Sequence, residues 1–526
     1  MFHAVEKRLA RFINAGQHSL LWQGQIGLEK ESLRVSPDGQ IVSTSHPQAL
    51  GSALTHPYIT TDYSEALTEF ITPPCDSADA ALSFLQDTQK FVYDNLQDEI
   101  LWATSMPCIV AGGDNIPLAE YGSSNIGIMK TVYRRGLGHR YGRTMQVIAG
   151  VHFNYSLLEE FWPAFQDLEQ DSHPLRYFID DAYLGLIRNL QRYGWLMPYL
   201  FGASPAVCKS FLGGRDTDLE EFDPYTYFKP FATSLRMGDI GYTNSKEAGV
   251  GIKADYDHLE AYIASLSRAI NMPCPQWQEI GVKVNGSYEQ LNANILQIEN
   301  EYYSTVRPKQ VPQGNEKPTL ALSQRGVRYV ELRSLDVNAF DHHGVSRDQV
   351  HFIQAFMLFC LLQESPRIDL LERREIDDNL LQTAHRGRDP ELKLQRNGKA
   401  VSLQKWALEL CAGMEAVCSL LDESDSQHPF SQALEMCQGL VHESDLTPSS
   451  RMLNEMRLQG ESFFDFAQRT SQEHHGYYKA LDLSPEKKVF YQHEAATSLE
   501  RQSVIEAMDD CSFDVFLTDY FNNNPK

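Results

Sequence analysis

The sequence predicts an α+β fold, in which strands and helices over residues 1–360 form one body and a mostly helical region follows over 361–526. Two observations support this division. Nearly all short segments that alternate between apolar and polar residues, or are rich in β-branched residues, lie before residue 360. Beyond residue 346, apolar residues recur instead with the period of amphipathic helices. With 42% hydrophobic residues, the chain can bury a large core.

The strand patterns occur in the order 27–35, 67–72, 145–156, 291–298 and 327–336. Gly and Pro turns separate them from helical patterns at 80–97, 174–193 and 256–270. Later helices are expected at 347–364, 403–421, 430–439 and 497–508. Acidic residues outnumber basic ones after residue 401, which is typical of a solvated helical surface.

The 526-residue chain has a formal net charge of −24, from 46 Lys and Arg against 70 Asp and Glu. Such a charge repels nucleic-acid phosphates and anionic membrane surfaces, so neither is expected as a partner. An anionic substrate would therefore need local cations or metal ions. The sequence contains no GxxxxGK[ST], HExxH or GxSxG motif, which excludes the commonest functions that a single motif defines.

The features that bear on location predict a cytoplasmic, soluble protein. The N-terminal segment has mixed charge and helical periodicity, unlike a secretory signal. The most apolar run, 352–362, contains Gln354 and is too short to cross a bilayer. The nine cysteines are scattered without a CxxC pair, which argues against a disulfide framework or a structural zinc site and predicts structural roles for all nine.

Glu29 and Glu31 lie in the strand pattern Gly-Leu-Glu-Lys-Glu-Ser-Leu-Arg-Val at 27–35. Because side chains in a strand alternate between two faces, both carboxylates point to one face and repel each other unless a cation lies between them. The pair therefore points to a hard metal ion. A solvent-exposed strand face that carries charges is the alternative for this segment alone.

The segment 60–74 contains Asp62 in a loop and Glu69 in a strand-like stretch that ends at two prolines. An acidic residue suits a strand poorly unless it binds a ligand, so Glu69 is a candidate metal ligand. Asp62 has two interpretations. It is either a metal ligand or the cap of a helix that begins near Ser64 with Glu65 in its first turn.

Along 145–156, the odd positions are apolar and the even positions include Gln146, His152 and Asn154. One face of this strand is therefore core and the other is polar. A neutral imidazole on the polar face suits the floor of a binding site, as a ligand for a metal or a phosphate, and a solvated polar face is the alternative.

Glu331 and Arg333 share one face of the strand predicted at 327–336. They form either a simple ion pair or a divided site, in which Glu331 binds magnesium and Arg333 contacts a transferring phosphoryl group. The divided site would neutralise the charge that develops in phosphoryl transfer.

Four strands thus present acidic, His or Arg side chains from one face, which is typical of a continuous antiparallel sheet lined with metal ligands. Carboxylate oxygens dominate this set, with one imidazole and no thiolate. Such hard donors favour Mg²⁺ or Mn²⁺.

Longer motifs follow one another from residue 27 to about 340, namely GLEKESLRV, LGSALTHPYITTDYSEALTEFITPP, LAEYGSSNIGIMKTVYRRGLGHRYG, MQVIAGVHFNYSL, YGWLMPYLFGASPAVC, ATSLRMGDIGYTN, LQIENEYYSTVRPK and YVELRSLDVNAF. In content and order they resemble the γ-proteobacterial type of glutamate–cysteine ligase, also called γ-glutamylcysteine synthetase. The resemblance is much weaker beyond residue 370.

The resemblance implies a saddle-shaped antiparallel sheet of the glutamine-synthetase-like superfamily, with flanking helices and a helical C-terminal region. The implied reaction joins L-glutamate to L-cysteine with ATP through a γ-glutamyl phosphate, the first step of glutathione biosynthesis. Magnesium ions neutralise the phosphates in that reaction. Inhibition by glutathione is a further expectation, because glutathione contains the same γ-glutamyl group.

The resemblance also assigns residues. The implied metal ligands are Glu29, Glu31, Asp62, Glu69, His152 and Glu331. Arg333 resembles the arginine that contacts the transferring phosphate, and Arg236 the arginine that contacts glutamate. The implied cysteine pocket consists of Tyr133, Leu137, Gln146, Tyr242 and Tyr303, with Tyr63 where the family can carry Phe. Without the resemblance, ordinary packing with a hydrogen-bonded hydroxyl would explain Tyr133, Tyr242 and Tyr303, and Arg236 would be a surface or ion-pair arginine.

Two other enzyme classes compete with this interpretation. The first is another ATP-dependent carboxylate–amine ligase of the same superfamily with a different acid or amine. The second is a metal-dependent phosphohydrolase, in which the same carboxylates bind phosphate and activate water. A non-catalytic binding protein is also an alternative, although none of the expected ligand carboxylates is missing.

Overall fold

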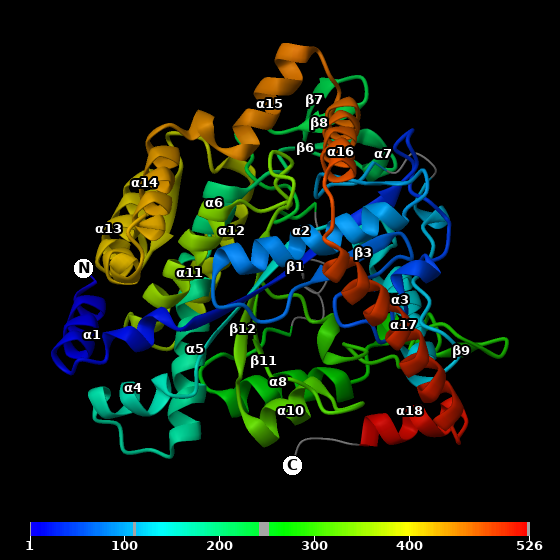
Figure 1. The fold of residues 1–526 in the computed structure, drawn as a ribbon, viewed down its shortest axis with the longest axis horizontal. Coiled ribbons are helices and arrows are strands. Elements are labelled where there is room, and N and C mark those ends of the chain that lie inside the picture. Colours follow the sequence, from blue (N-terminus) through cyan, green and yellow to red (C-terminus); the bar gives the residue numbers. More distant parts are fainter. Residues whose placement is uncertain (1, 109–111, 241–251, 523–526) are drawn as a thin grey trace.

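The computed structural model describes residues 2–108, 112–240 and 252–522 (Figure 1). At its centre lies an open antiparallel sheet with the strand order β11-β12-β5-β1-β3-β2, and β4 pairs with the end of β1. The predicted antiparallel sheet is therefore confirmed. Its strands are β1 (Gly24–Val35), β2 (Ile59–Thr61), β3 (Leu67–Ile71), β4 (Ile100–Leu101), β5 (Val151–Leu157), β11 (Val306–Lys309) and β12 (Tyr329–Leu335).

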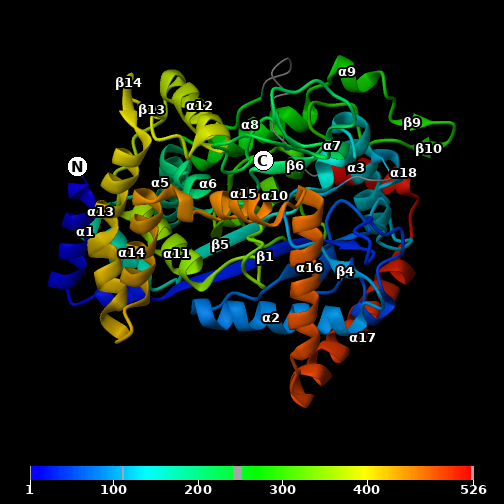
Figure 2. The ribbon, with the colours of Figure 1, turned by 90° about the horizontal axis from the view of Figure 1, so that it is seen from above.

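The two faces of the sheet have different surroundings. The side chain of Lys30, on β1, is buried and donates a hydrogen bond to Gln89 of helix α2 (Ala78–Asn95), so α2 covers this face. Because side chains alternate along a strand, Glu29 and Glu31 project to the opposite face. Figure 2 shows α2 on one side of β1 and helices α8 and α10 on the other.

Further helices and small sheets surround the central sheet. Up to residue 362 the other helices are α1 (His3–Asn14), α3 (Asn125–Tyr141), α4 (Phe161–Glu169), α5 (Leu175–Tyr193), α6 (Leu196–Phe201), α7 (Lys209–Leu212), α8 (Leu259–Asn271), α9 (Pro275–Gln278), α10 (Pro318–Arg325) and α11 (Arg347–Leu362). The small sheets consist of β6 (Ala206–Cys208), β7 (Glu220–Asp223) and β8 (Thr226–Phe228), and of β9 (Lys283–Val284) and β10 (Ser287–Tyr288).

The apolar run near residue 352 forms the core helix α11. Its start is fixed by a capping box, in which the Ser346 side chain accepts a hydrogen bond from the Gln349 backbone and the Gln349 side chain accepts one from the Ser346 backbone. Nearly every residue of α11 is buried, and the helix packs against α5 and α14. Among the described residues, no helix combines the length and apolarity that a bilayer crossing needs.

The C-terminal part of the chain consists of helices and one hairpin. The helices are α12 (Leu370–Arg386), α13 (Leu403–Leu421), α14 (Pro429–His442), α15 (Pro448–Gln459), α16 (Phe463–Ala480), α17 (Pro485–Met508) and α18 (Phe513–Asn522). The hairpin of β13 (Lys393–Arg396) and β14 (Lys399–Ser402) was not expected. Both α16 and α17 pack against α2, and α18 packs against α3 (Figure 1). The domain boundary at residue 360 stays a prediction.

Two of the strand predictions need correction. The strand expected at 145–156 begins only at Val151, because a 3-10 turn (Thr144–Val147) follows helix α3. The segment 291–298 is not a strand. Its polar side chains form hydrogen bonds with the local backbone: Gln297 Oε1 accepts from Leu291 N, and Asn292 Nδ2 donates to the Gln297 carbonyl. These bonds compete with the backbone hydrogen bonds that would pair a strand with its neighbour.

The structure contains one disulfide bond, which the scattered cysteines, taken as evidence against a disulfide framework, did not indicate. Cys108 and Cys208 are bonded, with their Cα atoms 5.4 Å apart and 100 residues between them in sequence. Folding brings them together, which spacing alone could not show. The other seven cysteines are free, including Cys411 and Cys418 on α13.

Candidate active site

Neighbouring strands bring the predicted acidic and histidine side chains to one face of the sheet. Glu29 lies opposite His152 across β1 and β5, and Glu31 lies opposite Glu69 across β1 and β3. Opposite residues of antiparallel strands project from the same face, so these four side chains share it. Glu331 of β12 joins them, because its partner on β5 lies two residues from His152.

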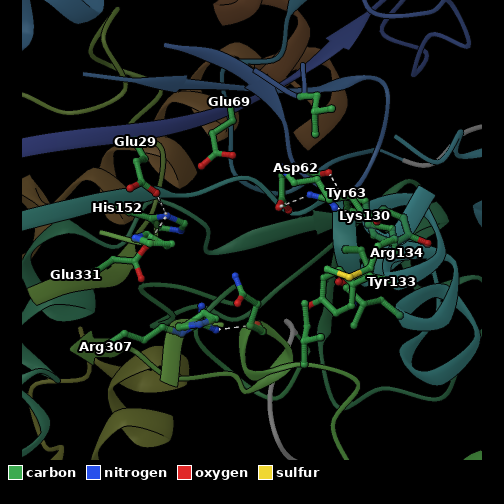
Figure 3. Close-up of a pocket in the computed structure, with 18 of the residues that line it drawn as sticks. Glu29, Asp62, Tyr63, Glu69, Lys130, Tyr133, Arg134, His152, Arg307 and Glu331 are labelled. Atoms are coloured by element: carbon green, nitrogen blue, oxygen red, sulfur yellow. Dashed lines mark hydrogen bonds and ion pairs between the residues drawn. The ribbon is translucent and has the colours of Figure 1, made fainter. Parts of the chain in front are cut away.

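Glu29, His152 and Glu331 form the tightest group in the site (Figure 3). Nδ1 of His152 lies 3.0 Å from Oε2 of Glu29 and 3.7 Å from Oε1 of Glu331. One ligand atom from each of the three residues lies within 4.8 Å of the others. The side chains of Glu331 and His152 are only 1% and 5% exposed, so water screens their charges weakly.

Two further carboxylates on the same face, Glu31 and Glu69, are buried beside other acidic side chains. Burial raises the pKa of Glu69 well above its ordinary value, and the carboxylates of Glu29 and Asp62 raise it further. Burial also raises the pKa of Glu31, although His152 opposes that rise. Such a concentration of buried acids favours binding of a cation or of protons.

Glu331 and Arg333 form the ion pair that was one of their two predicted roles. Nη1 of Arg333 donates to Oε1 of Glu331 at 3.0 Å, and Nζ of Lys309 lies 3.4 Å from Oε2. Burial opposes ionisation of Glu331, but Lys309 and Arg333 hold the pKa of its carboxyl below the ordinary value. The ion pair does not exclude the second role, because both side chains also line the cavity described below.

Asp62 and Tyr63 lie in the loop between β2 and β3. No helix begins at Ser64 in this described segment, so the alternative role of Asp62 as a helix cap is wrong. The Asp62 side chain is 46% exposed and lies across the cavity from the Glu29 group (Figure 3). Nη2 of Arg134 lies 3.9 Å from its Oδ1, and this guanidinium also donates to the Asp62 carbonyl.

One cavity of about 660 Å³ contains every predicted site residue that the structure describes. These residues are Glu29, Glu31, Asp62, Tyr63, Glu69, Tyr133, Leu137, Gln146, His152, Arg236, Tyr303, Glu331 and Arg333. Tyr242 lies outside the described residues. In the wall assigned to cysteine, Oη of Tyr63 and Nε2 of Gln146 are buried and have no hydrogen-bond partner among the described residues.

Arg236 lines the cavity and lies against Gly150, the residue just before β5. Its Nη2 donates to the backbone carbonyl of Arg333 at 3.0 Å, and its Nη1 lies 3.6 Å from Oδ1 of Asp336. A Cβ atom at Gly150 would lie 2.2 Å from that Nη2. The absence of a side chain at Gly150 therefore makes room for the guanidinium.

The cavity also contains four cations that the sequence prediction missed: Lys130 and Arg134 of α3, and Arg307 and Lys309 of β11. Burial and the neighbouring Arg134 lower the pKa of Lys130 to about 8. Their spacing in the sequence could have indicated this. Lys130 and Arg134 are four residues apart and share a helix face, and Arg307 and Lys309 are two apart and share a strand face. These cations meet the need for local positive charge in a chain of net charge −24.

The residues present are compatible with a hard divalent cation. Carboxylate oxygens and one imidazole supply the donors, as Mg²⁺ and Mn²⁺ prefer. Oε2 of Glu331 is buried and accepts no hydrogen bond from the described residues, which leaves a lone pair for a ligand. A cation in this group would also relieve the repulsion that raises the pKa of Glu69.

Two comparisons by sequence identify the same family. The sequence matches the model of the family described as glutamate–cysteine ligase over residues 9–383. The glutamate–cysteine ligase of Alcanivorax borkumensis is 44% identical over 524 residues, 99% of each chain, and that of Pseudomonas putida is 47% identical over 501 residues, 95% of each chain.

A solved structure extends this likeness to the fold. The crystal structure of the glutamate–cysteine ligase from Francisella tularensis in complex with AMP has a TM-score of 0.89 and 34% sequence identity, and the match covers 95% of this chain and 98% of that one. It confirms the predicted α+β fold class. By its sequence over nearly its full length and by its fold, the chain belongs to the glutamate–cysteine ligase family.

Proposed function

We propose that this protein joins the γ-carboxylate of L-glutamate to the amine of L-cysteine, using ATP and releasing ADP and phosphate. The observation that carries the proposal is a single cavity, in a chain of the glutamate–cysteine ligase family, that contains both a buried carboxylate group and a set of cations. The AMP in the related Francisella structure supports a nucleotide site in the same fold. Because ATP is available in the cytoplasm, we place the reaction there.

In the first step, an oxygen of the glutamate γ-carboxylate attacks the γ-phosphorus of ATP, ADP leaves, and γ-glutamyl phosphate forms. Arg236 is assigned to binding glutamate, because its guanidinium faces the cavity and is held by Asp336 and by a backbone carbonyl. Arg333 is assigned to the transferring phosphoryl group, where a guanidinium stabilises the charge of the transition state.

The proposed metal ligands are Glu29, Glu31, Asp62, Glu69, His152 and Glu331, with Mg²⁺ as the ion and Mn²⁺ as a substitute. When bound, the metal neutralises phosphate charge. Lys130, Arg134, Arg307 and Lys309 extend the positive charge along the cavity and are assigned to the remaining phosphates.

In the second step, the amine of cysteine attacks the carbonyl carbon of γ-glutamyl phosphate and phosphate leaves. The proposed cysteine pocket is the wall that contains Tyr63, Tyr133, Leu137, Gln146 and Tyr303, to which we add Tyr242 from the family resemblance. The buried hydroxyl of Tyr63 and amide of Gln146 offer polar contacts to the amino acid. We also propose that glutathione competes at this site, since it shares the γ-glutamyl group.

The function is tested by ADP release from the purified protein with Mg²⁺ and ATP. Four conditions are compared: glutamate alone, cysteine alone, both, and glutamate with 2-aminobutyrate, which has the amine but no thiol. Rapid release only with glutamate and an amine acceptor is the expected result. ADP release that needs neither amino acid would contradict the proposal and favour the phosphohydrolase.

Gly150→Ala is expected to raise KM for glutamate about tenfold, because the new Cβ pushes Arg236 from its position and weakens a charge-assisted contact. Steady-state kinetics with glutamate varied would measure this. Gly185→Ala is the matched control, since a Cβ there makes ordinary contacts of 3.5 Å with Ser365 and 3.6 Å with Arg188. An unchanged KM in a folded Gly150→Ala protein would contradict the role of Arg236.

A further inference from the structure

A second cavity, of about 420 Å³, lies on the reverse side of β12 from the candidate active site. Leu332 and Ser334 line it, whereas Glu331 and Arg333, which alternate with them along the strand, line the first cavity. Helices α5 and α12 supply much of the remaining wall, and Tyr303 borders both cavities. The volume lies within the range of small-molecule sites, roughly 300 to 1,000 Å³.

The interior of the second cavity is mainly apolar and aromatic. Its lining includes leucines of α5 and α12 and three aromatic rings, namely Leu190, Leu380, Leu381, Trp195, Tyr256 and Tyr302. Rings and leucines gain dispersion energy from contact with another flat apolar group, and aromatic pairs add a preferred geometry. The interior is therefore suited to an aromatic ring.

Two buried polar atoms of this lining lack a partner. Nε1 of Trp195 and Oγ of Ser334 form no hydrogen bond with any described residue. The two residues are only 2% and 3% exposed. Buried polar groups in folded proteins are nearly always paired, because leaving one unpaired is unfavourable. A hydroxyl oxygen on a bound ring would supply the missing acceptor.

Arg373 of α12 gives the cavity a positive charge that no described acidic side chain pairs with. Its Nη1 donates to Oε1 of Gln191 at 3.0 Å, and its guanidinium lies 5.8 Å from the centre of the Tyr256 ring. The other cation of the lining, Lys253, is already paired with Asp377. The guanidinium is thus held in place and remains available to a ligand carboxylate.

Asp239 gives the cavity a negative charge. Its Oδ1 lies 2.9 Å from Nε2 of His385, and its side chain is 55% exposed. Burial lowers the pKa of His385, so the imidazole is neutral near pH 7 and leaves the charge of the aspartate uncompensated. One unpaired cation and one uncompensated anion complement the carboxylate and ammonium groups of an α-amino acid.

We propose that the second cavity binds a free aromatic α-amino acid, with L-tyrosine as the best-fitting member of that class. The ring lies among Trp195, Tyr256 and the leucines, and its hydroxyl oxygen accepts a hydrogen bond from Ser334. The carboxylate pairs with Arg373 and the ammonium group with Asp239. The site is separate from the candidate active site, and the proposal does not depend on the proposed function.

The test compares L-tyrosine with three analogues that each lack one group. Tyramine lacks the carboxylate, 3-(4-hydroxyphenyl)propionate lacks the ammonium group, and L-phenylalanine lacks the hydroxyl. Equilibrium dialysis of labelled L-tyrosine against the full chain without ATP gives its dissociation constant, and competition gives those of the analogues. We expect the two analogues that lack a charge to bind about tenfold more weakly and L-phenylalanine about fivefold more weakly. Excess L-glutamate and L-cysteine should not displace the label.

Three variants assign the contacts. Arg373→Gln is expected to weaken L-tyrosine binding about tenfold but to change tyramine binding less than about twofold, because tyramine has no carboxylate to lose. Ser334→Ala should bind L-tyrosine only as well as L-phenylalanine. Arg374→Gln is the matched control, since Arg374 is the exposed neighbour of Arg373 outside the cavity, and it should bind L-tyrosine normally.

Three results would overturn the inference. They are the absence of saturable L-tyrosine binding to the wild-type protein, equal affinity for L-tyrosine and all three analogues, and displacement of the label by L-glutamate and L-cysteine. The last result would place the bound amino acid in the first cavity. Melting temperatures of the variants show whether a loss of binding reflects a lost contact or a damaged fold.

Discussion

Glu331→Gln is expected to lower kcat/KM at least about 100-fold and to raise the Mg²⁺ concentration needed for half-maximal activity. Loss of a residue that only supports a metal ligand typically lowers metal affinity or activity 10- to about 100-fold, and Glu331 is assigned as a ligand itself. The amide has the shape of the carboxylate but lacks its charge, so the change removes an anionic donor 1% exposed to solvent. Initial rates at varied Mg²⁺ would measure both effects.

Glu220→Gln provides the control for Glu331→Gln. Glu220 is an exposed residue of β7 outside the cavity, and its replacement should leave both the rate and the Mg²⁺ dependence unchanged. Because Glu331 also pairs with Arg333 and Lys309, the melting temperature of each variant should be measured. A folded Glu331→Gln protein with normal turnover and normal Mg²⁺ dependence would refute the assignment of Glu331 as a metal ligand.

Arg333→Gln is expected to lower kcat about 1000-fold while KM for cysteine changes little. Removing one preorganised group that stabilises transition-state charge lowers kcat roughly 100- to 1000-fold. Removing an arginine that contacts a transferring phosphoryl group can lower kcat further. The guanidinium is placed for this role, because Nη1 is held by Glu331 and Nε has no hydrogen-bond partner among the described residues. Single-turnover measurement of ADP formation would follow the phosphoryl-transfer step directly.

The metal dependence distinguishes Arg333→Gln from a variant that has lost the metal. Arg333→Gln should retain the wild-type Mg²⁺ requirement, whereas Glu331→Gln should not. Arg328→Gln is a matched control, since Arg328 lies just before β12 and pairs with Glu159 outside the cavity. If ADP forms at the wild-type rate in Arg333→Gln, the arginine has no part in phosphoryl transfer.

The order of elements and much of the metal-binding face could be predicted from local sequence. Alternation along β1 placed Glu29 and Glu31 on one face, and alternation along β12 placed Glu331 beside Arg333. A strand has a period of two, so a short stretch is sufficient for this inference. The helix expected at 403–421 is α13 with the same bounds. These properties depend only on neighbours in sequence.

Sequence alone could not decide between the paired interpretations of single segments. An aspartate such as Asp62 suits both a helix cap and a metal ligand. Only the structure excluded the helix cap, because the chain forms a loop between β2 and β3 and no helix begins there. The strand predicted at 291–298 was wrong because side-chain hydrogen bonds replaced a ladder, and apolar spacing does not report such bonds. The Cys108–Cys208 bond likewise depends on a contact across 100 residues.

The sequence by itself therefore determined which residues share a strand or helix face and, through its motifs, which family the chain resembles. Only the tertiary structure decided which faces meet. It placed Lys130, Arg307 and the C-terminal Tyr520 in one cavity with Glu331, although these residues are separated by up to several hundred positions. The physical reason is that local periodicity is fixed by backbone geometry, whereas the assembly of a site is fixed by the packing of distant elements around one core.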